Sequence, residues 1–188
     1  MPKPIPISHP LRRLFLGLTE RTFSDRLQWR EADVIGYVSD VLGDFAHMEN
    51  LYRIRNARGH RVEEVAEMLL EGDLLHRAGS PERERAVQKH IGDYTLFMTG
   101  LFPEYVQRLK TRRVLGSADA FLDYMHVGKR AYGLVAAHAE ATQTKAAPLF
   151  RKLAANFELC VYGLSHVRRD LDQLRHPAFR SLSSMLLA

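Results

Sequence analysis

Hydrophobic residues recur along this chain at helical spacing, and no segment alternates apolar and polar positions as a half-buried strand does. Near the N-terminus, Leu11, Leu14, Phe15 and Leu18 stand at i, i+3, i+4 and i+7, which predicts an amphipathic helix. The same period predicts six helices, over residues 10–21, 31–49, 61–77, 80–102, 117–142 and 148–171. A further turn or two is expected after Pro103. The chain is therefore expected to be all-α, a compact single-domain bundle of five to seven helices.

The two ends of the chain are expected to lie outside this bundle. Closely spaced prolines make residues 1–9 an extended arm, and Pro10 suits the first turn of a helix. The bundle domain is expected to span residues 10–178. Residues 179–188 carry only a weak pattern, which indicates a C-terminal tail.

Length and composition place the chain among ordinary globular domains. Its 188 residues suffice for one domain, and 46% are hydrophobic. No run of 18 apolar residues occurs, so no membrane insertion is expected. The proline-rich N-terminus does not resemble a secretory signal, and we expect a cytoplasmic protein.

Several kinds of active site are excluded by motif. The chain has no glycine-rich phosphate loop, no H-E-x-x-H and no G-x-S-x-G. No histidine has a glutamate three residues before it, which argues against a carboxylate-bridged di-iron bundle. The only cysteine, Cys160, stands on an apolar helical face and is expected in the core.

Three polar residues fall on helix faces that are expected to point inward. His90 lies within the apolar stripe of the helix over 80–102, and Asp93 lies at the edge of that stripe. His138 lies on the inner side of the helix that follows. Imidazole and carboxylate together suit several first-row metals, so one hypothesis is a metal or cofactor site. The alternative is a structural network of buried polar groups, which the sequence favours.

Glycines in these two helices suggest either close helix approach or room for a bound molecule. Gly92, Gly100, Gly128 and Gly133 each cost roughly 1 kcal/mol against alanine inside a helix. If the glycines leave a pocket, its expected lining residues are Tyr94, Tyr124, Gly128 and Tyr132.

The connection between the second and third expected helices is basic. It carries Arg53, Arg55, Arg58 and Arg61 without an acidic residue, and the whole chain has a formal charge of +5. Such a stretch can hold phosphate or other anionic groups, or it is only a solvated connection. No base-reading motif accompanies it, so nucleic acid is not an expected partner.

Two segments, residues 90–104 and 123–136, resemble a group of bacterial all-helical proteins with no established activity. The resemblance implies that these two helices form the centre of the fold, and it implies no activity.

Three functions therefore stand as alternatives. The favoured one is a non-enzymatic binding or interaction module, expected to be a homodimer. The second is a metal- or cofactor-binding bundle, loosely like haem-oxygenase-type folds, between the helices that carry His90 and His138; the cofactor is not identified. The third is an anion binder that uses the arginines of 53–61.

Overall fold

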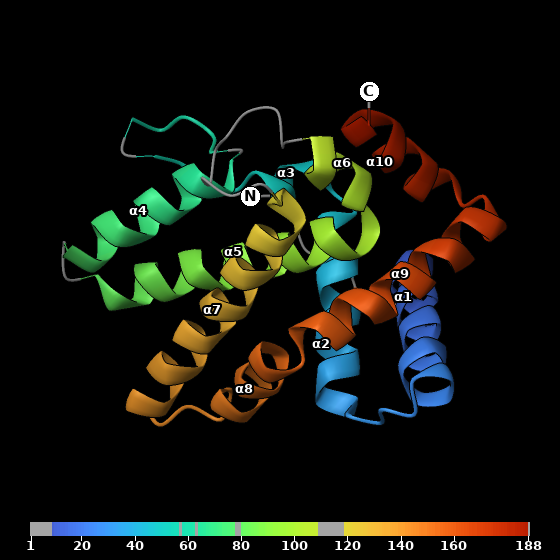
Figure 1. Cartoon of the computed structure of the whole chain (residues 1–188), viewed down its shortest axis with the longest axis horizontal. Coiled ribbons are helices and arrows are strands. Elements are labelled where there is room, and N and C mark those ends of the chain that lie inside the picture. The colour runs from blue at the N-terminus through green and yellow to red at the C-terminus, as the bar shows by residue number, and fades with distance from the viewer. Residues whose placement is uncertain (1–8, 57, 63, 78–79, 109–118, 188) are drawn as a thin grey trace.

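The computed structural model describes residues 9–187, except 57, 63, 78–79 and 109–118. This part of the chain is all-helical, as expected, and its only β pairing is an isolated antiparallel bridge between Arg55 and Arg61. The elements are α1 (Pro10–Glu20), a π-helical turn (Arg21–Arg26), α2 (Ala32–Phe45), α3 (Met48–Leu51), α4 (Val65–Arg77), α5 (Pro81–Leu101), α6 (Pro103–Arg108), α7 (Ala120–Ala141), α8 (Ala147–Ala155), α9 (Phe157–Leu174) and α10 (Pro177–Leu187) (Figure 1).

The helices in the described residues outnumber the predicted five to seven because two predicted helices are interrupted and the C-terminal segment forms a helix of its own. The helix predicted over 31–49 ends at Phe45, and the short α3 follows it. The helix predicted over 148–171 divides at Asn156, whose side-chain amide donates to the Lys152 carbonyl at 3.0 Å. Apolar periodicity continues across such a break, so the pattern alone does not reveal it.

The C-terminal segment is not the tail that its weak pattern indicates. Pro177 stands at the first position of α10, where its missing N–H costs nothing. Phe179 is buried against Phe102, with ring centroids 5.7 Å apart, and Leu186 is buried as well. These two side chains anchor α10 to the bundle. Of the predicted arm over residues 1–9, all but His9 lies outside the described residues.

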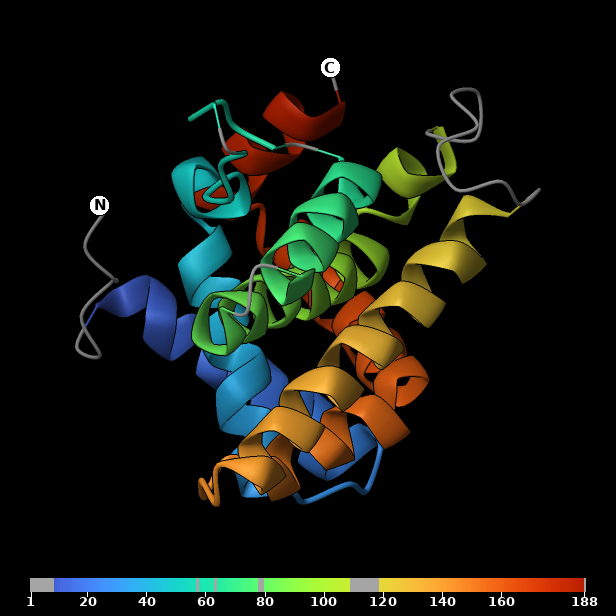
Figure 2. The same ribbon diagram turned by 90° about the vertical axis from the view of Figure 1, so that its left-hand side faces the viewer.

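Helix α5 forms the centre of the fold. It packs most extensively against α7, and also against α4, α9 and α2. Both views show α4 running beside α5 and α7 crossing it (Figure 1, Figure 2). Every residue from His90 to Leu101 is buried. A helix buried on all sides has no solvent face for its polar residues, so each of them needs a partner within the protein.

Three of the four glycines of α5 and α7 bring helices together. A Cβ placed at Gly92 would lie 2.6 Å from the ring of Tyr132, and one at Gly100 would lie 2.5 Å from the Leu164 Cβ. At Gly128, a Cβ would collide with Phe157 and Thr95. Of the two interpretations of these glycines, the structure shows close approach. The space beside each of these three glycines is filled by protein side chains.

We predict opposite effects for alanine at two glycines of α7. Gly128→Ala overpacks the side of the helix that faces α5 and α9 and should lower the free energy of unfolding by about 2 kcal/mol. Gly133 faces open space, since no described atom of a neighbouring element lies within 4 Å of where a Cβ would stand. Gly133→Ala should therefore raise stability by about 0.5–1 kcal/mol. Urea unfolding followed by circular dichroism measures both, and equal effects would contradict this packing.

Candidate functional site

The polar centre of the fold is Asp93 on α5, which is only 3% exposed. Its Oδ1 accepts hydrogen bonds from the Tyr37 hydroxyl at 2.5 Å and from the Tyr132 hydroxyl at 2.9 Å. Its Oδ2 lies 2.7 Å from Lys89 Nζ and 3.9 Å from an Arg53 guanidinium nitrogen. Four side chains from α2, α5, α7 and the connection after α3 therefore meet at one carboxylate.

The two tyrosines act as fixed donors to Asp93. Burial, followed by the negative charge of Asp93, raises the pKa of both Tyr37 and Tyr132 well above the usual value. Both hydroxyls therefore stay protonated throughout the physiological range. Lys89 and Arg53 are 39% and 42% exposed at their side chains, so the charged side of Asp93 faces the molecular surface. On its other side, Asp93 meets the fully buried Tyr132 and the partly buried Tyr37.

His90 is a second buried polar residue, one turn before Asp93. Its Nε2 lies 3.0 Å from the carbonyl oxygen of Leu51, so Nε2 carries the proton and donates. Its Nδ1 is buried without a hydrogen-bond partner among the described residues. Burial, with a smaller contribution from the charge of Arg53, lowers the pKa of His90 to about 3. His90 is therefore neutral and ties α5 to the end of α3.

The structure does not bring His138 to these two residues. Tyr132 already reaches Asp93, and His138 stands six residues farther along α7, roughly 9 Å along the helix axis. Within the described residues, no group of three His, Cys, Asp or Glu side chains is arranged to hold a metal. Of the residues proposed for a metal or cofactor site, His90 and Asp93 lie one turn apart on α5, and His138 lies apart from them. The Asp93 oxygens and the His90 Nε2 already contact protein groups.

The remaining residues of the predicted pocket are packed in the core. Tyr94 and Tyr124 are buried with ring centroids 6.5 Å apart, and Tyr132 packs on Gly92. Two cavities in the described part of the chain are lined by other residues.

Cys160 is fully buried, as expected from its apolar helical face. Burial raises the pKa of its thiol to about 12. It is therefore a core residue and not an accessible thiolate.

The basic connection folds into a short hairpin, described at residues 54–56 and 58–62. Ile54 and Val62 are buried at its base, and the Val62 N–H donates to the Ile54 carbonyl at 2.9 Å. At its tip, the Asn56 side-chain oxygen accepts from two backbone N–H groups, those of Arg58 and His60. Gly59 has φ +80°, a conformation that favours glycine in the turn. The connection is thus a hydrogen-bonded turn that projects from the helical bundle.

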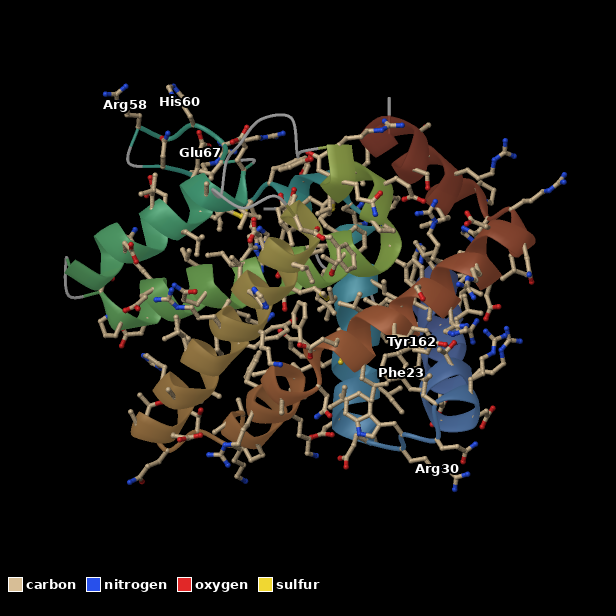
Figure 3. All side chains as sticks on the ribbon, in the orientation of Figure 1. Phe23, Arg30, Arg58, His60, Glu67 and Tyr162 are labelled. Atoms are coloured by element: carbon tan, nitrogen blue, oxygen red, sulfur yellow. The ribbon has the colours of Figure 1, made fainter. Side chains whose placement is uncertain are left out.

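The hairpin presents its basic side chains to solvent. Arg55, Arg58, His60 and Arg61 are all exposed, and Figure 3 shows Arg58 and His60 pointing away from α4. Arg55, Arg58 and Arg61 form no ion pair with a described residue. This includes Glu67 at the start of α4, the acidic residue labelled in Figure 3. By contrast, nine other basic residues in the described part of the chain pair with carboxylates: Arg12, Arg21, Arg26, Arg53, Lys89, Lys129, Arg151, Lys152 and Arg168.

The sequence did not identify two members of the Asp93 cluster as site residues. Lys89 stands four residues before Asp93, a spacing at which opposite charges pair on a helix, so a signal for it exists in the sequence. Tyr37 comes from α2, fifty-six residues away in sequence, and only the tertiary fold brings it to Asp93. Arg53, which was predicted as part of an anion site, lies 3.9 Å from Asp93 Oδ2.

No helix in the described ranges is long and apolar enough to cross a membrane. Comparison with protein-family models, with curated proteins and with solved structures gives no match.

Proposed function

We propose that this protein is a binding module whose basic hairpin, residues 54–62, recognises an acidic segment of a partner protein. The observation that carries the proposal is the set of three exposed arginines on an ordered turn, without ion pairs to the described residues. A guanidinium donates two parallel hydrogen bonds to a carboxylate, so three such guanidinium groups suit a run of aspartate and glutamate.

The Asp93 cluster supports this role by fixing the base of the hairpin. Arg53 lies directly before the hairpin and reaches Asp93, while Leu51 accepts the hydrogen bond from His90. Ile54 and Val62 add buried anchors on both strands. A projection held in this way loses little conformational entropy when it binds, which favours affinity.

An acidic protein segment fits the hairpin better than a nucleic acid does. Proteins that bind single strands stack bases on exposed aromatic rings. The nearest aromatic residue in sequence, Tyr52, is half-buried at the foot of the hairpin, with its ring centroid 6.5 Å from that of Tyr94. Among the described residues, the hairpin offers mainly charge and hydrogen-bond donors, and its one aromatic ring is the exposed imidazole of His60.

The test is the affinity for a short labelled peptide of alternating glutamate and serine, measured by fluorescence anisotropy at about 50 mM salt, where surface charges are weakly screened. The variant Arg55→Glu/Arg58→Glu/Arg61→Glu should bind on the order of 30-fold more weakly, because three attractive contacts become repulsive. The control Arg13→Glu/Arg169→Glu/Arg180→Glu changes the net charge equally at positions on α1, α9 and α10, and it should retain most of the affinity.

Three outcomes would contradict the proposal. The first is that the wild-type protein does not bind the glutamate peptide. The second is that both triple variants lose affinity equally, which would indicate an effect of net charge only. The third is that a single-stranded DNA of matched charge binds the hairpin more tightly than the peptide does. The same peptide with glutamine in place of glutamate controls for contacts to its backbone. Native mass spectrometry on the same samples tests the predicted homodimer.

A further inference from the structure

A cavity of about 310 Å³ lies between α4, α5 and α7, away from the hairpin. Each of these helices contributes residues at helical spacing, so the cavity has three walls. Leu69 and Asp73 come from α4, Glu84 and Gln88 from α5, and Val127, Arg130, Ala131 and Leu134 from α7. Its volume is at the lower end of the range of about 300–1,000 Å³ that small-molecule sites occupy.

Gln88 indicates that this cavity is more than a packing gap. Its side chain lines the cavity and is only 7% exposed, yet its amide makes no hydrogen bond within the part of the chain that the structure describes. The amide nitrogen and oxygen are therefore free to donate and to accept hydrogen bonds toward a molecule bound in the cavity.

Two charged residues face the cavity from different helices. Asp73 of α4 and Arg130 of α7 both line it, and neither forms an ion pair with another described residue. Glu84, the other acidic residue of the lining, already has an interaction of its own. The remaining lining residues, Leu69, Val127, Ala131 and Leu134, are apolar. The cavity therefore presents a carboxylate, a guanidinium, an amide and an apolar wall.

We infer that this cavity binds a small zwitterion with an apolar body, of the amino-acid or short-peptide class. The ammonium group of the ligand pairs with Asp73, and its carboxylate takes two parallel hydrogen bonds from Arg130. Gln88 hydrogen-bonds to the polar end of the ligand, and the ligand's apolar side chain lies against the leucines. This inference does not depend on the hairpin, because no residue is shared between the two sites.

The test is an NMR titration of the wild-type protein with three probes of matched shape: L-leucine, 4-methylpentanoate and 3-methylbutylamine. L-phenylalanine and the dipeptide Leu-Leu extend the series. L-leucine should bind saturably, and the two analogues that lack one charge should each bind at least about ten-fold more weakly.

Two variants separate the two charges. Arg130→Gln should weaken L-leucine about ten-fold and leave the amine unchanged. Asp73→Asn should weaken both L-leucine and the amine and leave the carboxylate probe unchanged. Arg83→Gln, at a position of α5 outside the cavity lining, is the matched control and should change nothing.

Gln88→Leu separates ligand binding from structure. The substitution keeps a side chain of similar size and removes an amide for which the described residues provide no hydrogen bond. The melting temperature should therefore stay the same or rise while L-leucine binds more weakly. The inference is overturned if none of the three zwitterions binds saturably, if the amine binds as tightly as L-leucine, or if the cavity variants bind like Arg83→Gln.

Discussion

Replacing Asp93 by alanine is expected to lower the free energy of unfolding by about 3 kcal/mol. The substitution removes the acceptor of both the Tyr37 and Tyr132 hydroxyls and leaves Lys89 and Arg53 without their shared carboxylate. Tyr132 is fully buried and Tyr37 is partly buried, so water does not readily replace the lost bond of Tyr132. Because the two cations are partly exposed, most of the loss comes from the tyrosine hydroxyls.

Asp172 provides the matched control for this prediction. It also forms an ion pair at spacing i, i+4, with Arg168, but its side chain is 55% exposed where that of Asp93 is 4% exposed. Asp172→Ala should therefore cost at most about 0.5 kcal/mol. Urea unfolding of both variants at neutral pH gives the comparison. Similar losses in the two variants would show that the tyrosine bonds to Asp93 stabilise little.

The second large effect expected is a loss of stability in mild acid that depends on His90. Its pKa is about 3 in the folded protein, against an ordinary value of 6.5 when unfolded. Below pH 6.5 the unfolded chain takes up a proton that the folded protein does not, so stability falls as the pH falls toward 3. Between about pH 7.5 and 4.5 this one residue should remove roughly 2.5 kcal/mol.

His90→Gln isolates that contribution. A glutamine amide donates to the Leu51 carbonyl from near the position of Nε2, but it does not titrate. Unfolding free energies of both proteins, measured across that pH range, should differ at its upper end and approach each other as the wild type loses stability. A constant difference across the range would show that His90 is protonated in the folded state as readily as in the unfolded chain.

The helical class and the inward side of α5 were predictable from the sequence, because both depend on local periodicity. Gln88 could not be identified, since its environment is set by the close approach of α4 at Gly72, where a Cβ would lie 3.0 Å from the Gln88 amide nitrogen. His138 shows the same limit. Only the register of α7 on α5 reveals that it lies about two turns from the point where Tyr132 meets Asp93.

For the basic stretch, composition alone does not distinguish a solvated connection from an ordered one. In the structure, two residues fix the turn. The Asn56 side chain accepts two hydrogen bonds from backbone N–H groups, and Gly59 adopts a positive φ. An asparagine three residues before a glycine is a turn signal that the sequence contains. The burial of Ile54 and Val62 depends on the tertiary fold and was not predictable from local pattern.

Hydrogen exchange of the wild-type protein, with and without saturating glutamate–serine peptide, tests the central proposal most directly because it maps the contact. We expect slower exchange of backbone amides in the hairpin, where Gly59 and Val62 donate to backbone carbonyls, and unchanged exchange along α4 and α7. Protection elsewhere on the molecule, or no protection of the hairpin by bound peptide, would contradict the assignment of residues 54–62 as the binding surface.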